Sequence, residues 1–391
     1  MIPYGRQDID EKDIEAVIST LKSDWLTQGP SIPRFERALA DYCGVEHAVA
    51  VNSATSALHI ACLALGVEQG DMVWTSPNSF VASANCVIYC GATVDFVDIS
   101  LDTGNMCIEA LEEKLVHAKA TNTLPKVVIP VHFAGQSCDM RAISKLAEDY
   151  GFYIIEDASH AVGGAFKNTP VGRCEYSDIC VFSFHPVKII TTMEGGMALT
   201  SNETLAEKMM QLRSHGITND PSKMQCSSDG PWYYEQIDLG FNYRMNDVEA
   251  ALGLSQLSRL DSFVEARNKL VAIYNGKLST EPKIVPLSLA PNVYSSYHLY
   301  VVRIEGIDQT QHRHIIESLR SKGIFAHVHY IPIHLQPYYQ AKLPKNYALP
   351  NAERYYREAI TLPLYPKLTP SEISYITDNL ITLVDEIASK A

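Results

Sequence analysis

The most evident shortage in this chain is positive charge. Its 391 residues include 32 lysines and arginines against 45 aspartates and glutamates, which gives a formal net charge of −13. Proteins that bind nucleic acid neutralise its phosphates with clustered lysine and arginine side chains. The sequence has no basic stripe, so we expect no nucleic-acid partner.

Long apolar runs are also missing. No stretch approaches the roughly 20 uncharged apolar residues that a membrane-spanning helix needs. The first residues, MIPYGRQDIDEKDIEAV, have neither the charged nor the apolar region of a signal peptide. Because 46% of the residues are nevertheless hydrophobic, the chain can bury a large core. We expect a cytoplasmic globular protein with two domains and no membrane partner.

Metal, disulfide and dinucleotide motifs are scarce. The nine cysteines are an odd number without a CxxC pair, which favours reduced thiols and no structural zinc. His327, His329 and His334 lie close together, but no matching carboxylate or cysteine motif accompanies them. We interpret them as part of a binding surface or of the core, and expect no metal site. The first strand is followed by NSATSA, which lacks the glycine fingerprint of dinucleotide-binding proteins.

Between residues 71 and 200, short apolar strands alternate with helical stretches. Strands are predicted at 72–76, 93–97, 126–131, 153–157 and 178–184, and helices at about 79–90, 108–118 and 139–150. This alternation is typical of βαβ units on a mostly parallel sheet. In such sheets, functional residues gather beyond the carboxyl ends of the strands.

The last third of the sequence changes character. Strands are predicted at about 296–303 and 324–330, with helices near 309–321, 350–360 and 370–389. We therefore expect a large α/β domain at 1–255 and a smaller α+β domain at 256–391. The polar segment 216–236 is too long for a simple connector, and we interpret it as a lid, a substrate-binding element or a subunit contact.

One lysine has an unusual setting. Lys188 lies in the stretch VFSFHPVKIITTMEGG, after an apolar strand and among apolar neighbours. Such a setting is expected to remove water from the ammonium group and to lower its pKa. The neutral amine that results near pH 7 is the form that makes a Schiff base with an aldehyde.

Other polar groups stand where strands end or helices begin. Asp157 ends an apolar strand, where a carboxylate needs a cation or hydrogen-bond donors, although it could also cap a following helix. His160, three residues later, is a core histidine or a donor near a bound group. The small residues around Ala54 and Thr55 open a helix after the strand at 47–52, which suits a phosphate but also an ordinary N-cap.

These features together fit pyridoxal phosphate, which needs an amine for its aldehyde, a carboxylate for its ring nitrogen, donors for its phosphate and a flat group against its ring. The sequence resembles the DegT/DnrJ/StrS family of sugar aminotransferases among the fold-type I pyridoxal-phosphate enzymes. The resemblance covers almost the whole chain and rests on WLTQGP, NSATSALHIA, EDASHA, FSFHPVK followed by EGG, and GFNYRMNDVEAALGLSQL, in the family's order and spacing.

The resemblance implies the fold and the role of each cofactor residue. It implies a mostly parallel seven-stranded sheet between helices in the large domain, and a homodimer with shared active sites. Lys188 would be the catalytic residue that binds the cofactor aldehyde and moves protons. The remaining cofactor contacts would be Asp157 at the ring nitrogen, Phe80 on the ring, His160 beside it, Ala54, Thr55 and Ser183 at the phosphate, and Asn242 reaching that phosphate from the neighbouring subunit.

One departure from the family pattern and one agreement with it bear on function. Met193 precedes Glu-Gly-Gly where many members have a small residue, which we interpret as a packing change or an altered pocket floor. Family members that remove a hydroxyl group instead have histidine at the position of Lys188, so the lysine argues against that dehydratase chemistry.

The substrate is predicted from the least specific residues. The closest branch of the family implies L-glutamate as amino donor and UDP-2-acetamido-2,6-dideoxy-β-L-arabino-hexos-4-ulose as acceptor, in the pseudaminic acid pathway that serves flagellin glycosylation and surface polysaccharides. Another nucleotide-linked 3- or 4-ketosugar, for instance of the perosamine type, stays open. Segments with aromatic and hydrogen-bonding groups suit a nucleotide sugar, and the expected contacts are Tyr4, Trp25, Leu26, Thr27, Gln28, His329, Tyr330, Ile331 and Pro332.

Overall fold

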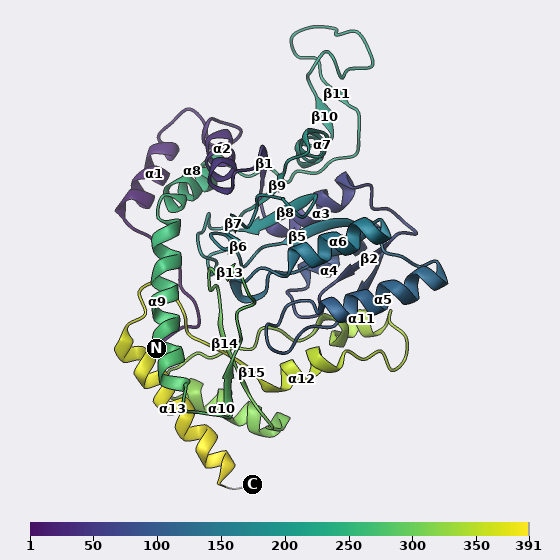
Figure 1. Ribbon diagram of the computed structural model, residues 1–391. Helices are drawn as coiled ribbons and strands as arrows, with labels where there is room; N and C mark the ends of the chain where they lie inside the picture. The colour runs from purple at the N-terminus through teal and green to yellow at the C-terminus, as the bar shows by residue number, and fades with distance from the viewer. Residues whose placement is uncertain (390–391) are drawn as a thin grey trace.

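A seven-stranded sheet forms the centre of the protein (Figure 1). The computed structural model describes residues 1–389. Along the sheet the strands are β1 (His47–Val51), β9 (Gly196–Thr200), β8 (Ile179–Ser183), β5 (Tyr153–Asp157), β4 (Val127–Ile129), β2 (Met72–Thr75) and β3 (Thr93–Phe96). Only β9 runs antiparallel to its neighbours, so the predicted mostly parallel seven-stranded sheet is confirmed.

Helices cover both faces of this sheet because its strands are apolar on both sides. Along β4, Val127 and Ile129 belong to the core under α3 and α4, whereas Val128 packs into the core under α5 and α6. Successive strand residues point to opposite faces, so a continuous apolar run buries both. The helices of this part are α1 (Glu11–Leu21), α2 (Ser31–Cys43), α3 (Ala54–Ala64), α4 (Ala82–Tyr89), α5 (Ile108–Thr121), α6 (Met140–Tyr150), α7 (Glu203–Arg213), α8 (Asp247–Leu257) and α9 (Leu260–Leu278).

The C-terminal part builds a second, three-stranded sheet. Its strands are β12 (Ile284–Pro286), β14 (Tyr300–Ile304) and β15 (Ala359–Leu362), and its helices are α10 (Gln309–Ser321), α11 (Pro337–Gln340), α12 (Pro350–Glu358) and α13 (Pro370–Ala388). Helices α9, α10 and α13 bury their apolar faces against this sheet in a core of their own. The expected boundary at 255/256 falls within α8, and the division into two domains there remains a prediction.

The strand predicted at 324–330 is wrong. Only single bridges form there, from Ile324 to Ile2 and from His327 to Thr361. The backbone then leaves the small sheet and reaches the loop that follows β2 of the large sheet, where the Tyr330 N–H donates to Asn78 Oδ1 at 3.3 Å. His327 is consequently exposed and His329 buried, although their rings lie 4.7 Å apart.

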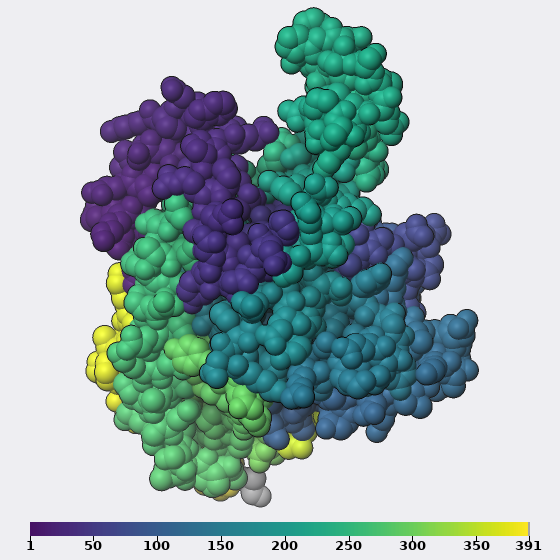
Figure 2. All heavy atoms as spheres, turned by 45° about the horizontal axis from the view of Figure 1, so that its top comes forward, coloured from purple at the N-terminus to yellow at the C-terminus, as the bar shows by residue number. Residues whose placement is uncertain are grey.

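The polar segment 216–236 projects from the body of the protein, at the top of Figures 1 and 2. Its base is a two-stranded ribbon of β10 (Ile217–Thr218) and β11 (Glu235–Gln236). Trp232, at its outer part, is 74% exposed. A further small sheet joins β6 (Ala165–Phe166), β7 (Thr169–Pro170) and β13 (Val293–Tyr294). Among the described residues, every helix is too short or too polar to cross a membrane.

A glycine sets the distance between the sheet and α3. Gly196 opens β9, and a Cβ atom built on it would lie 2.5 Å from the Ala54 nitrogen and 2.6 Å from the Ser53 carbonyl carbon. Both are backbone atoms, which cannot rotate away as a flexible side chain can. The first turn of α3 therefore sits directly on the start of β9.

Replacing Gly196 with alanine should displace the first turn of α3 and lower the free energy of unfolding by about 1–3 kcal/mol, the usual cost of overpacking. Gly276→Ala is the matched control, because a Cβ atom there meets nothing within 4 Å and the position lies within α9. That control should raise stability by up to about 1 kcal/mol. Urea unfolding monitored by circular dichroism measures both, and equal effects would contradict the close contact at Gly196.

Candidate active site

Asp157 is a buried carboxylate at the carboxyl end of β5, with only 4% of its surface exposed. The Ser83 hydroxyl donates to its Oδ2 atom at 2.6 Å, and the Ser159 hydroxyl donates to Oδ1 at 2.6 Å. The Ser159 N–H adds a third hydrogen bond to Oδ1, at 3.2 Å. Residues 158–163 form turns, so Asp157 does not cap a helix. These hydroxyl and amide donors hold the carboxylate in one orientation.

Lys188 lies in the connection between β8 and β9, and its side chain is half-buried. The loop is tied across its base, where the Phe184 N–H donates to the Gly195 carbonyl at 2.9 Å. Burial lowers the pKa of Lys188 to about 8, and the negative charge of Asp157 opposes part of that shift. The lowered pKa agrees with the expectation from the sequence, but at pH 7 roughly nine tenths of such side chains still carry the proton.

His160 is a neutral histidine with a defined tautomer. The Ala134 N–H donates to its Nδ1 atom at 3.3 Å, so its Nε2–H donates to the Tyr330 hydroxyl at 3.0 Å. Burial, together with the positive charge of Lys188, holds the pKa of His160 well below its usual value. His160 therefore links the end of β5 to the segment that comes from the C-terminal part.

The start of α3 offers free backbone donors. Ser53 caps the helix by accepting from the Ser56 N–H at 3.1 Å, so the ordinary N-cap is present. Within the described residues, the N–H groups of Ala54 and Thr55 donate to no protein atom. Ser183 ends β8 opposite Gly196, which abuts Ala54, and its hydroxyl also has no hydrogen-bond partner among these residues. Two amides and a hydroxyl with free hydrogens, at a helix N-terminus, form a cradle that fits a phosphate group.

Phe80 follows β2 and stands at the rim of the site. Its side chain is 60% exposed, and its ring centroid lies 6.4 Å from that of Tyr330, which also contacts His160. Ser83 lies within hydrogen-bond distance of both the Phe80 carbonyl and the Asp157 carboxylate, so the exposed ring stands near the carboxylate and offers a flat face to a ring of a bound molecule. The expected cofactor residues of one chain thus gather at one edge of the sheet.

Asn242 stands apart from this group. It is exposed and forms a bridge to Ser214, and its side chain makes no hydrogen bond within the described chain. Its backbone carbonyl accepts from Asn52 Nδ2 at 3.4 Å. Met193, where the sequence departs from the family pattern, is 48% exposed and adopts a left-handed conformation with φ of 72°.

The expected substrate residues separate into two groups. The ring of Tyr4 packs on His327 and His329, at centroid distances of 5.4 and 5.1 Å. His329 Nδ1 lies 2.9 Å from the Thr361 hydroxyl, and Tyr330 contacts His160, so this group adjoins the cofactor residues. Ile331 is exposed, whereas Pro332 is buried.

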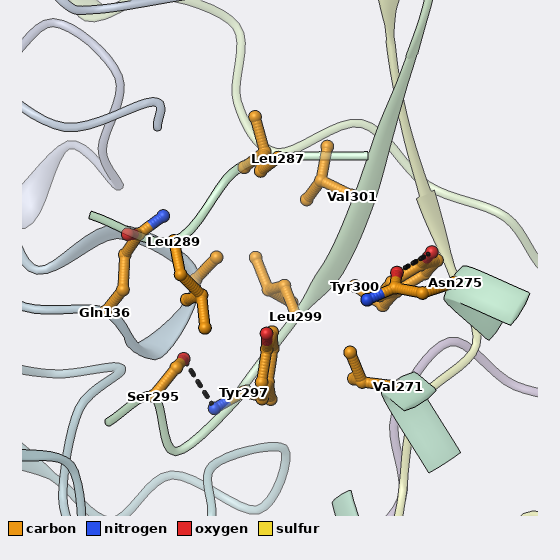
Figure 3. A pocket seen from close by; sticks show the side chains of 11 residues that line it. Gln136, Val271, Asn275, Leu287, Leu289, Ser295, Tyr297, Leu299, Tyr300 and Val301 are labelled. Carbon is orange, nitrogen blue, oxygen red and sulfur yellow. Dashed lines mark hydrogen bonds between the residues drawn. The ribbon is translucent and has the colours of Figure 1, made fainter. Parts of the chain in front are cut away.

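The second group is the loop at 25–28, in which Trp25, Leu26, Thr27 and Gln28 are all exposed. It is anchored to the start of α8, where the Asp247 N–H donates to the Leu26 carbonyl at 3.0 Å. The Asp247 carboxylate in turn accepts from the Gly29 N–H at 2.9 Å. A separate, mainly apolar pocket between α9 and the segment 287–301 contains none of the predicted site residues (Figure 3).

The sequence reasoning missed several residues that support the site. Ser83 is the second residue of α4 and lies three residues after Phe80, which precedes the helix, and this spacing could have indicated that it faces the same site. Asn78 and His298 carried no such signal. His298 is buried with its ring centroid 4.4 Å from that of His160, a contact that only the folded chain creates. Among residues 1–389, no three histidine, cysteine or acidic side chains cluster as metal ligands do.

Comparison with known proteins agrees with this geometry. Residues 7–381 match the DegT/DnrJ/EryC1/StrS aminotransferase family. The chain belongs to this family. It is a pyridoxal-phosphate-dependent sugar aminotransferase with the fold-type I architecture.

Similar proteins extend over almost the full chain. The UDP-4-amino-4,6-dideoxy-N-acetyl-beta-L-altrosamine transaminase of Campylobacter jejuni is 37% identical, with 99% of this chain and 98% of that protein covered. The spore coat polysaccharide biosynthesis protein SpsC of Bacillus subtilis is also 37% identical, with 100% and 98% covered.

Two solved structures share the fold closely. The putative sugar aminotransferase Spr1654 of Streptococcus pneumoniae, in its PMP form, has a TM-score of 0.90 at 32% identity, with 99% and 100% of the two chains covered. Helicobacter pylori PseC, described as an aminotransferase involved in pseudoaminic acid biosynthesis, has a TM-score of 0.89 at 34% identity, with 98% and 99% covered.

The lowered pKa of Lys188 predicts how the rate of cofactor uptake depends on pH. Protein stripped of cofactor should take up pyridoxal phosphate faster as the pH rises through about 8, where the amine loses its proton. Asp157→Asn removes the charge that favours the ammonium form, so the inflection should move to lower pH. Stopped-flow absorbance measures the rates, with the exposed Glu194 changed to glutamine as a control. An inflection near 10.5, the value of a solvated lysine, would contradict the assigned pKa.

Proposed function

We propose that this enzyme transfers the amino group of L-glutamate to C4 of UDP-2-acetamido-2,6-dideoxy-β-L-arabino-hexos-4-ulose. The product is UDP-4-amino-4,6-dideoxy-N-acetyl-β-L-altrosamine, an intermediate for pseudaminic acid. The observation that best supports the aminotransferase chemistry is the lowered pKa of Lys188 together with the buried, hydrogen-bonded carboxylate of Asp157. The similarity to the Campylobacter jejuni transaminase and to PseC supports the choice of sugar.

Each side chain in the proposed cofactor site has a separate role. Bound pyridoxal phosphate supplies an aldehyde and a ring that accepts an electron pair. The Lys188 amine would hold the aldehyde covalently, and as general base and acid the same side chain would take the donor's α-proton and supply a proton to the sugar carbon. Asp157, oriented by hydrogen bonds from Ser83 and Ser159, would keep the ring nitrogen protonated. Phe80 would lie against one face of the ring.

The phosphate is held at the start of α3 and at the end of β8. This placement is supported by the N–H groups of Ala54 and Thr55 and by the Ser183 hydroxyl, which have no hydrogen-bond acceptor among the described residues. His160 is neutral, so it orders Tyr330 beside the ring without adding positive charge. In a homodimer, Asn242 of each chain reaches the cofactor phosphate of the other, which agrees with its exposed side chain.

The sugar nucleotide is recognised by the aromatic and polar groups at the mouth of the site. Tyr4, His329 and Tyr330, followed by Ile331 and Pro332, adjoin the cofactor residues. The loop formed by Trp25, Leu26, Thr27 and Gln28 is exposed and presents an aromatic surface and side-chain donors. Aromatic faces suit the uracil base and the sugar ring, whereas donors suit the hydroxyls and the diphosphate. We place the reaction in the cytoplasm and its product in surface glycans such as those on flagellin.

A second acceptor is a different nucleotide-linked 3- or 4-ketosugar, of the perosamine type or another. This acceptor stays an alternative because the chain is as similar to the spore coat polysaccharide protein SpsC as to the Campylobacter jejuni transaminase, at 37% identity to each. Both acceptors would use the same cofactor residues and differ only in contacts at the mouth of the site.

A panel of acceptors should separate these functions. With glutamate as donor, turnover of the UDP-linked L-arabino 4-ketose should exceed that of its D-xylo epimer and of GDP-4-keto-6-deoxymannose by at least about tenfold in kcat/KM. Formation of 2-oxoglutarate and of aminosugar measures turnover, and Lys188→Ala protein serves as the inactive control. Preference for either of the other sugars would overturn the pseudaminic assignment and leave the aminotransferase chemistry in place.

Shared active sites can be tested with mixed dimers. Lys188→Ala and Asn242→Ala chains, each carrying a different affinity tag, are coexpressed and the mixed species is purified. One of its two sites should combine an intact lysine with an intact asparagine, and the rate per dimer should return to about half of the wild-type rate. If the mixed dimer forms and stays as inactive as its parents, Asn242 acts within its own chain.

A further inference from the structure

The segment 241–243 is a short extended stretch with two different faces. Its backbone is pinned on one side, where the Phe241 N–H donates to the Leu212 carbonyl at 2.7 Å and the Tyr243 N–H donates to the Arg213 carbonyl at 3.0 Å. Alternate side chains of an extended segment point to opposite faces. Phe241 and Tyr243 accordingly stack on each other, with centroids 4.8 Å apart and planes 13° apart, whereas Asn242 between them is exposed.

The two aromatic rings rest on a buried histidine of α3. His59 is 5% exposed, and its ring centroid lies 4.8 Å from that of Phe241. Its Nδ1 atom lies 3.1 Å from the Tyr243 hydroxyl, within hydrogen-bond distance. A polar contact inside an aromatic cluster has one good geometry, so it fixes the rotation of the tyrosine as well as its position.

A second set of hydrogen bonds reaches the same segment from the N-terminal end of α3. The Asn52 N–H donates to the Tyr243 carbonyl at 2.8 Å, and Asn52 Nδ2 donates to the Asn242 carbonyl at 3.4 Å. The Asn52 amide oxygen accepts from the Ser56 hydroxyl, in the first turn of α3, at 2.7 Å. Segment 241–243 is thus attached both to the N-terminus of α3 and to its middle.

We propose that His59 is a positioning residue for Asn242. It acts through Tyr243 and Phe241, which orient the short segment whose exposed side presents the Asn242 side chain to the neighbouring subunit. Helix α3 then serves two cofactors, because its N-terminus binds the phosphate of its own chain and His59 supports the residue that reaches the phosphate of the partner. This inference rests on the shared active site proposed above.

Cofactor affinity is the first test. His59→Ala and Tyr243→Phe should each raise the Kd for pyridoxal phosphate by about tenfold, the size expected for weakening one hydrogen bond to a charged group. Equilibrium dialysis measures Kd, and thermal unfolding without cofactor identifies any variant that fails to fold. Tyr243→Phe keeps the ring and loses one oxygen atom, so it still tests the contact if His59→Ala does not fold. His117→Ala, on the exposed side of α5, is the matched control. An unchanged Kd in the folded variants would overturn the proposal.

Mixed dimers decide whether His59 acts on its own site or on the partner's. A dimer of one His59→Ala chain and one Lys188→Ala chain is assayed at a cofactor concentration that leaves the His59→Ala homodimer largely unloaded. The intact lysine in this dimer faces the Asn242 segment of the chain that retains His59. About half of the wild-type rate per dimer should therefore return.

The Asn242→Ala and Lys188→Ala mixed dimer is run in parallel. If that dimer recovers activity and the His59 dimer does not, His59 serves the cofactor of its own chain, and the inference fails while the shared site stands. If neither recovers, the shared site and the inference fail together.

Discussion

The buried carboxylate of Asp157 is the group on which the candidate site depends. A negative charge at the end of an internal strand is costly unless donors and a cation offset it. Ser83 from α4 and Ser159 from the following turn donate to its two oxygens, and Lys188 stands close enough for its pKa to respond to the charge. The carboxylate therefore fixes the positions of three separate segments around one edge of the sheet.

The same edge is where the parallel strands end, and the antiparallel β9 alone begins there. Its first residue, Gly196, allows the start of α3 to approach to backbone contact. That approach sets the free N–H groups of Ala54 and Thr55 beside Ser183 at the end of β8. The free amides at the start of α3 and the Asp157 carboxylate are consequently held by regular secondary structure, which positions groups more rigidly than mobile loops do. Lys188 instead lies in the loop between β8 and β9, which the hydrogen bond from Phe184 to Gly195 closes at its base.

The C-terminal part completes the site through side chains rather than through its sheet. Residues 328–333 leave the edge of β15 and cross to the loop that follows β2, where the Ile333 N–H donates to the Pro77 carbonyl at 2.9 Å. Tyr330 thereby reaches His160, and Tyr4 packs behind it on His329. Segment 328–333 therefore connects the expected cofactor residues with the proposed sugar-binding residues.

The sequence by itself determined the sheet and the chemistry of the site. Apolar strands that alternate with helices encode a parallel sheet locally, and the lysine, aspartate and helix-start motifs each lie within a few residues of a strand end. The tertiary structure alone decided how His298 and Asn52 support that site, because their contacts join segments far apart in the chain. It also decided that residues 324–330 are not a strand. The pattern there suits an extended backbone, but the choice between pairing with β15 and bonding to Asn78 depends on where the two sheets lie in space.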